Sequence, residues 1–272
     1  MATLLRTAKS ASDWTAYDLR AYNITVSFSP EYTFYGTSLP TVASITGTNY
    51  NIDPNLLSGT LSTQGLSSET LRLLQYLDLS SRADSGQEST VHDFAKEILR
   101  TLGYQYYESL LRTRYAIPLS ISGDPNRSAQ TDVCLVHGRS NLIVVPVVQT
   151  TVDPDPQVIA SAIAAFQHNN RIRLQLGKME LSFATIPCIA MIGTRPTFYY
   201  VPVTKVLSEA VLAGQYPASA TTVKKCVVVS NSGRLNEGME SPDFRQVAIQ
   251  HYIAFRTPAW TYWNNSTGSG FQ

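Results

Sequence analysis

The chain has 272 residues, of which 43% are hydrophobic and 15% are charged, and its formal net charge is +1. This length allows a sizeable core in one large domain or two small ones, and the composition excludes a disordered chain. Because the net charge is almost zero, any attraction to nucleic acid must come from a local basic patch.

No membrane partner is expected. The first residues, MATLLRTAKS, lack the apolar segment of a secretory signal peptide, and no apolar run reaches the ~18 residues that span a bilayer. We therefore expect a cytoplasmic protein. Cys134, Cys188 and Cys226 lie in apolar runs, so we expect buried thiols and neither a disulfide framework nor a zinc site.

The first 85 residues read as an α+β extension that packs on the rest. A strand is predicted at 22–29, a turn-rich stretch at 34–40, and a helix at 67–79 with a serine cap and leucines at helical spacing. The polar stretch from Ser80 to Gln87 reads as a linker, so we place the boundary there.

Residues 86–256 have a clearer rhythm, and residues 257–272 read as a flexible tail. Helices are predicted at 88–104, 153–174, 204–215 and 241–256, and strands at 106–122, 183–193, 198–204 and 222–230. The strand at 106–122 is predicted to end in the GDPN turn at 123–126. A hairpin of two short apolar strands is predicted at 131–151. The pattern indicates an α/β fold with a central mixed sheet flanked by helices.

The order helix, three strands, helix, strand is that of the PD-(D/E)XK (restriction-endonuclease-like) core. Nucleases on that scaffold hold Mg²⁺ with two carboxylates and use a lysine to position the attacking water. Glu88 and Asp132 match two of the acidic positions, whereas Val147 stands in place of the other acid and Gln149 in place of the lysine. We expect no cofactor, with weak Mg²⁺ binding by the remnant pair Glu88 and Asp132 left open.

Three stretches carry a narrower resemblance. LLRTRYAIPL, RSAQTDVCLV and DPDPQVIASAIAAFQHNN resemble blocks of a large family of uncharacterised mushroom (Agaricomycete) proteins with such a core. The likeness covers most of residues 12–256. Family members normally end the second hairpin strand in a triplet similar to E-D-K, from which this chain departs. Since mushrooms make proteins of about this size that depurinate ribosomal RNA, the resemblance suggests a ribosome-inactivating toxin or defence protein.

The residues of one short stretch suit that chemistry. Cleavage of an adenine glycosidic bond needs aromatic faces around a flipped base, a carboxylate near the oxocarbenium-like sugar, and a cation near the leaving purine. The predicted catalytic residues are Glu108, Arg112, Arg114 and Asp132. The predicted substrate-binding residues are Tyr104, Tyr106, Tyr107, Arg171 and Arg173, the last two from a basic helix end that also holds His168 and Lys178.

Three other functions stay open. A catalytically inactive module would retain ribosomal RNA or other nucleic acid without forming a product. A weak Mg-dependent nuclease would cut RNA without further treatment. A storage or defence protein with no nucleic-acid role would show no salt-dependent binding. Gly-x-Ser-x-Gly is absent from the sequence, so a serine hydrolase is not favoured, and His137 reads as a surface residue of the hairpin turn.

Overall fold

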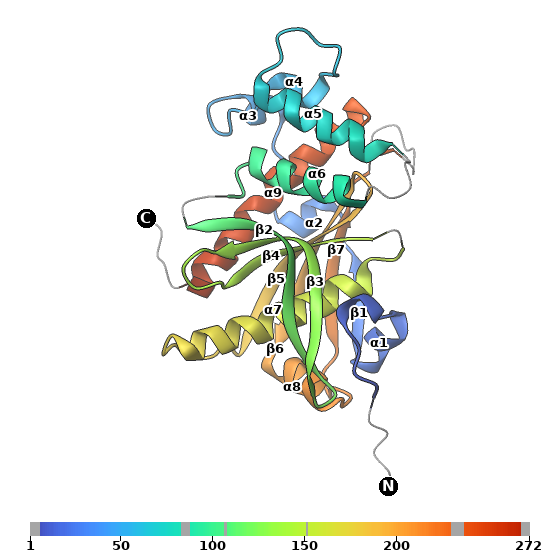
Figure 1. Ribbon diagram of the computed structural model, residues 1–272, viewed down its shortest axis with the longest axis vertical. Helices are drawn as coiled ribbons and strands as arrows, with labels where there is room; N and C mark the ends of the chain where they lie inside the picture. The colour runs from blue at the N-terminus through green and yellow to red at the C-terminus, as the bar shows by residue number, and fades with distance from the viewer. Residues whose placement is uncertain (1–5, 83–87, 106–107, 151, 230–236, 268–272) are drawn as a thin grey trace.

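A computed structural model of the chain describes residues 6–82, 88–105, 108–150, 152–229 and 237–267. Within them, seven strands form one mixed sheet flanked by helices (Figure 1), as the sequence predicts. The strands are β1 (Ile24–Phe28), β2 (Ser109–Ile121), β3 (Asp124–His137), β4 (Ile143–Gln149), β5 (Phe183–Ile192), β6 (Arg195–Thr204) and β7 (Thr221–Val227). The helices are η1 (Ala11–Asp13), α1 (Ala16–Ala21), α2 (Glu31–Tyr35), α3 (Val42–Thr46), α4 (Pro54–Ser58), α5 (Ser68–Ser81), α6 (Glu88–Thr101), α7 (Asp155–Gln175), α8 (Lys205–Ala213) and α9 (Pro242–Thr267).

The strand order across the sheet is β1-β7-β6-β5-β4-β3-β2. The meanders β2-β3-β4 and β5-β6-β7 are antiparallel, and β4 pairs parallel with β5 after the crossover through α7. The segment from α6 to β5 therefore has the predicted order of helix, three strands, helix and strand.

The N-terminal extension packs on the rest of the chain and also completes its sheet. Strand β1 pairs parallel with β7 and forms one edge. In Figure 1, α3, α4 and α5 lie at the top, over α6. Helices α5 and α6 are joined by an ion pair between Arg72 Nε and Glu97 Oε1 at 2.6 Å and by a second between Arg100 and Glu69 at 2.8 Å. Residues 1–85 are therefore not a separate sheet-forming unit.

Two local predictions are wrong. The β2–β3 turn is Ser122–Gly123, both with positive φ (52° and 79°). Of the predicted GDPN turn only Gly123 belongs to it, and the residues from Asp124 onward form the start of β3. Left-handed residues match the twist of a two-residue hairpin, which favours this tighter turn. The predicted flexible tail is helical as far as Thr267, because α9 continues through Pro258. The Tyr262 side chain is buried there and accepts a hydrogen bond from Asn169 Nδ2 at 3.0 Å.

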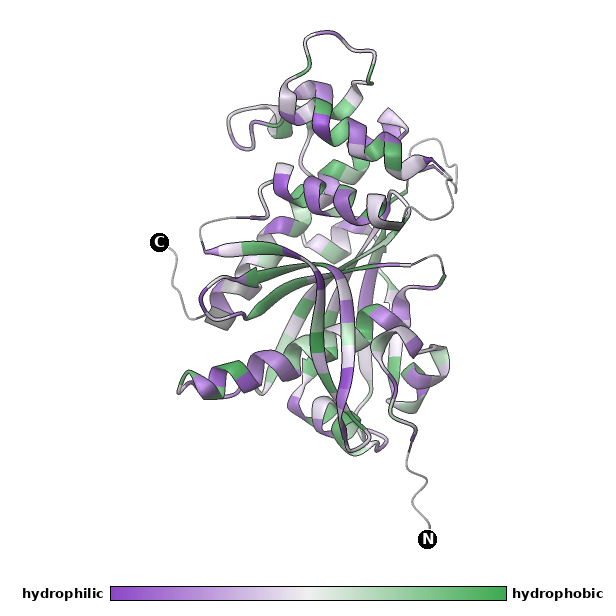
Figure 2. Ribbon diagram, viewed as in Figure 1, coloured by the Kyte–Doolittle hydropathy of each residue, from purple (hydrophilic) through white to green (hydrophobic). Residues whose placement is uncertain are grey.

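Two long helices cover opposite faces of the sheet. Tyr199 on β6 donates a hydrogen bond to Asp155 of α7 at 2.8 Å, whereas the next residue, Tyr200, faces residues of α9 across a cavity. Successive side chains of a strand point to opposite faces. In Figure 2 the enclosed strand β4 is hydrophobic along its length, while α6 and the free end of α7 carry more polar residues. The three cysteine thiols are buried and unpaired, as predicted.

Candidate functional site

The end of β4 lies beside Asp132 of β3. Val133 pairs with Val147 and Cys134 with Pro146, so the antiparallel register brings the last residues of β4 next to Asp132. The backbone N–H of Gln149 donates a hydrogen bond to Asp132 Oδ2 at 2.5 Å. Asp132, which lies within β3, is therefore next to the C-terminal end of β4.

A histidine from α6 contacts the same carboxylate. His92 Nε2 lies 2.8 Å from Asp132 Oδ1, and each of the two side chains is 17% exposed. Both oxygens of Asp132 are thus engaged, one by a ring and one by the backbone. The sequence interpretation missed His92, although it lies four residues after Glu88 and hence on the same helical face. Glu88 begins α6, but its side chain lies outside the described part of the structure.

Gln149 leaves a polar atom without a partner. Its side-chain Nε2 is buried, and no described residue hydrogen-bonds to it. A buried amide N–H without an acceptor costs free energy, so such a group is a donor ready for a ligand. We name His92, Asp132 and Gln149 the β4-end site. It combines a carboxylate, an imidazole and an unused hydrogen-bond donor.

This site is poorly suited to a metal ion. Val147, which occupies the position of the missing acid, is 1% exposed and belongs to the hydrophobic core. Mg²⁺ is held by carboxylate oxygens and waters, and Asp132 is the one carboxylate among the three residues of the β4-end site. Among the described residues there is no cluster of three or more His, Cys, Asp or Glu that could hold a metal.

Two predicted arginines lie along β2, next to Asp132. The pairs Thr113 with Val133 and Tyr115 with Thr131 place Arg114 opposite Asp132. Arg112 and Arg114 are both exposed. The Arg112 guanidinium lies over the Tyr115 ring at 4.5 Å from its centroid, and Arg114 has a positive φ of 51°. The left-handed residue breaks the regular edge of β2, and both cations stay accessible to solvent.

Glu108 does not belong to this site, contrary to the sequence prediction. It forms an ion pair with Arg139 at 2.7 Å and contacts His137 Nε2 at 2.9 Å. Because His137 is five residues from Asp132 along β3, the two places are roughly 16 Å apart. His137 is largely buried, and its Nδ1 accepts a hydrogen bond from the Ser140 backbone at 3.2 Å and lies 2.5 Å from Ser140 Oγ. This Glu–His–Ser chain closes the β3–β4 turn.

The prediction that Tyr104 binds the substrate is also wrong. The Tyr104 ring is fully buried, and its hydroxyl donates to the Tyr252 carbonyl at 2.7 Å. Burial raises the pKa of the Tyr104 hydroxyl well above its ordinary value. Tyr104 therefore fixes the end of α6 against α9 and has no face for a base. Tyr106 and Tyr107 lie outside the described residues.

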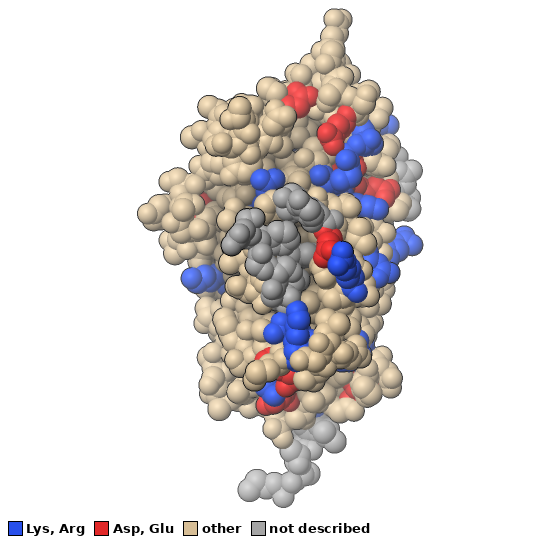
Figure 3. Space-filling model, turned by 90° about the vertical axis from the view of Figure 1, so that its left-hand side faces the viewer, with Lys and Arg blue, Asp and Glu red and all other residues tan. Residues whose placement is uncertain are grey.

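The predicted basic strip lies at the free end of α7 and does not reach Asp132. Arg171 Nη2 is 3.2 Å from His168 Nδ1, and Arg173 Nε donates to the Met179 carbonyl at 2.9 Å. Burial lowers the pKa of His168, which disfavours its charged form. Figure 3 shows the face that carries this helix end. Cationic and anionic side chains are scattered over it, with no broad area of one sign.

No protein family model matches the chain, and no curated protein matches it. In the described residues, none of the helices is both long enough and apolar enough to cross a membrane.

Proposed function

We propose that this protein acts on RNA as a metal-independent enzyme that removes an adenine from ribosomal RNA of the large subunit, and so serves as a ribosome-inactivating toxin or defence protein. The β4-end site is the observation that carries the proposal. A partly buried Asp–His pair beside an unused amide donor is a set suited to acid–base chemistry without a metal. The scaffold resembles a PD-(D/E)XK core in its element order, with Asp132 in the corresponding place.

The proposed chemistry uses each group of the site once. The Asp132 carboxylate stabilises the positive charge that develops on the ribose as the glycosidic bond breaks. His92, oriented by Asp132 through Nε2, gives a proton to the departing purine from its other ring nitrogen. A water molecule adds to C1′ of the ribose, and the proton that this water releases returns to His92. The free Gln149 Nε2–H donates to an acceptor of the flipped nucleotide, and a purine offers several such nitrogens.

The arginines of β2 supply the contact with the RNA backbone. Arg112 and Arg114 are exposed beside Asp132, and guanidinium groups bind phosphate with directed hydrogen bonds. With a chain charge of only +1, attraction of RNA requires such a local group of cations near the site. The proposed catalytic centre does not include Glu108, Tyr104, Arg171 or Arg173, because their contacts lie away from Asp132.

A catalytically inactive RNA-binding module is the second candidate. It is favoured by Val147 and Gln149, which leave the nuclease pattern without its second acid and its lysine. Such a module retains RNA through Arg112 and Arg114 and releases no product. A weak Mg-dependent nuclease is less compatible with the site, because the buried side chain of Val147 stands in place of the second acid.

The test uses purified ribosomes, which are incubated with the protein in the presence and absence of EDTA. The RNA is then extracted and treated with aniline. We expect a discrete fragment only after aniline, unchanged by EDTA. His92→Gln should abolish it. The matched control His137→Gln, which alters the other carboxylate-paired histidine, should not. A fragment that needs no aniline and disappears with EDTA contradicts the proposal in favour of a nuclease.

A further inference from the structure

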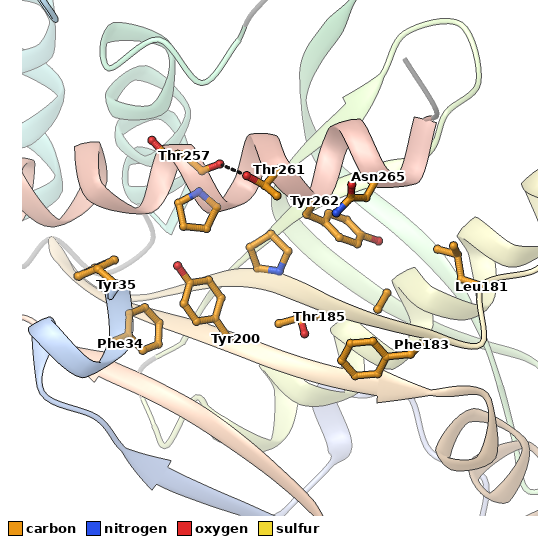
Figure 4. A pocket seen from close by; sticks show the side chains of 13 residues that line it. Phe34, Tyr35, Leu181, Phe183, Thr185, Tyr200, Thr257, Thr261, Tyr262 and Asn265 are labelled. Carbon is orange, nitrogen blue, oxygen red and sulfur yellow. Dashed lines mark hydrogen bonds between the residues drawn. The ribbon is translucent and has the colours of Figure 1, made fainter. Parts of the chain in front are cut away.

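A cavity of about 530 Å³ lies between α9 and the strands β5 and β6, with α2 at one end. It shares no lining residue with the β4-end site. In Figure 4, Phe34 and Tyr35 stand at one end and Leu181 and Phe183 at the other, with α9 above and Tyr200 rising from β6 below. Its 13 lining residues include five aromatic rings and two prolines, and none of them is charged.

One tyrosine that lines this cavity, Tyr200, has a hydroxyl without a partner in the described part of the chain. Tyr200 Oη is buried, and no described residue hydrogen-bonds to it. The Tyr200 ring is stacked on Phe34 with centroids 4.3 Å apart and on Phe255 at 5.4 Å, and this packing favours the position of its hydroxyl. Burial raises the pKa of the Tyr200 hydroxyl, so it stays protonated and acts as a donor.

The neighbouring hydroxyls do not complete this hydrogen bond. Tyr35 Oη is 3.0 Å from His251 Nδ1, and Thr261 Oγ1 donates to the Thr257 carbonyl of its own helix at 3.1 Å. Figure 4 shows the Tyr200 hydroxyl directed toward α9, into the space between helix and strands. A buried donor in an uncharged, ring-lined space defines the ligand that would satisfy it.

We propose that this cavity binds a neutral, ring-containing, lipophilic small molecule whose one oxygen acceptor receives the hydrogen bond of Tyr200. The volume lies within the range of small-molecule pockets. The absence of lining charge makes an anionic or cationic ligand costly to desolvate there. The aromatic and proline faces offer flat apolar contact, and exposed Phe183 continues that lining to the surface.

Prodan, a neutral naphthalene with one carbonyl oxygen whose fluorescence reports polarity and hydrogen bonding, is a suitable probe. We expect saturable binding of Prodan with a shift of its emission to shorter wavelength. Tyr200→Phe, which removes only the hydroxyl, should weaken Prodan binding roughly 3- to 10-fold. The matched control Tyr216→Phe alters an exposed tyrosine outside the cavity lining and should leave binding unchanged.

A second probe separates the hydroxyl from the apolar walls. N-phenylnaphthylamine is neutral and aromatic but has no oxygen acceptor, so Tyr200→Phe should bind it as tightly as the unaltered protein does. Thermal unfolding without ligand should show Tyr200→Phe to be at least as stable, because an unsatisfied donor is removed. Failure of both probes to bind, equal Prodan affinity of Tyr200→Phe, or a less stable Tyr200→Phe would overturn the proposal.

Discussion

Acidification should destabilise the protein, with the largest contribution from one buried histidine, His251. His251 on α9 is 2% exposed, and its Nδ1 lies 3.0 Å from the Tyr35 hydroxyl. Burial lowers the pKa of His251 from 6.5 to about 4. The Glu31 carboxylate, 3.7 Å from His251 Nε2, does not offset this effect because Glu31 is half exposed to water.

The direction of the pH dependence follows from proton binding by the folded and unfolded states. Between pH values of about 6.5 and about 4, the unfolded chain protonates His251 and the folded protein does not, so the free energy of unfolding falls as the pH falls. The contribution is fully present above the unfolded pKa. At a pH of about 4.5, the loss from this residue amounts to about 2.5 kcal/mol. The pKa of His168 is also lowered and adds a loss of the same sign.

Urea unfolding at a pH of about 7 and again at about 4.5 measures this loss. His251→Gln has no group that titrates in this range, so its difference in unfolding free energy between the two pH values should be smaller by about 2.5 kcal/mol. The comparison holds even where the substitution lowers stability at both pH values, because only the difference is used. An equal pH dependence in both proteins refutes the assignment to His251.

Two further substitutions and one thiol reagent test the packing of buried residues. Arg245 is 3% exposed and donates to the carbonyls of Leu57, Gly59 and Met239. Arg245→Ala should therefore lower the free energy of unfolding, measured in urea, by roughly 3–5 kcal/mol. A decrease under about 1 kcal/mol contradicts the account. Burial raises the pKa of the Cys134 and Cys226 thiols to about 12, so neither should react with Ellman's reagent near pH 8 until urea unfolds the chain; rapid native labelling refutes this. Val147→Glu should destabilise the protein by several kcal/mol, because the side chain is enclosed in the core, and should not create nuclease activity; a stable variant that cuts RNA with Mg²⁺ is the opposite result.

Much of the fold followed from local patterns. The long helix α7, with its acidic and proline-containing start, and the apolar hairpin around Asp132 have sequence patterns that survive packing. The β2–β3 turn was not predicted, because Ser122 takes a left-handed conformation without being glycine. The helical tail was not predicted either, because Tyr262 is fixed by a distant partner, Asn169. Such long-range contacts leave no trace in local composition.

The candidate site was predictable only in part. Asp132 was found because a nuclease hairpin places an acid there, whereas His92 carries no pattern apart from its spacing to Glu88. Glu108 was grouped with Arg112 and Arg114 because the three lie in one short stretch of sequence. In the structure Glu108 contacts His137, and five residues of β3 separate that place from Asp132. Tyr104 was predicted to bind the substrate because an aromatic cluster in a core and one on a binding surface have the same composition.

Release of free adenine tests the central claim most directly. Ribosomes are incubated with the protein, and adenine in the supernatant is quantified by mass spectrometry beside Asp132→Asn and the control Asp124→Asn, which lies at the far end of the same strand. We predict adenine release by the unaltered protein and by Asp124→Asn, and a loss of at least about 100-fold in Asp132→Asn with its fold intact. No adenine from the unaltered protein, or equal release by all three, contradicts the account.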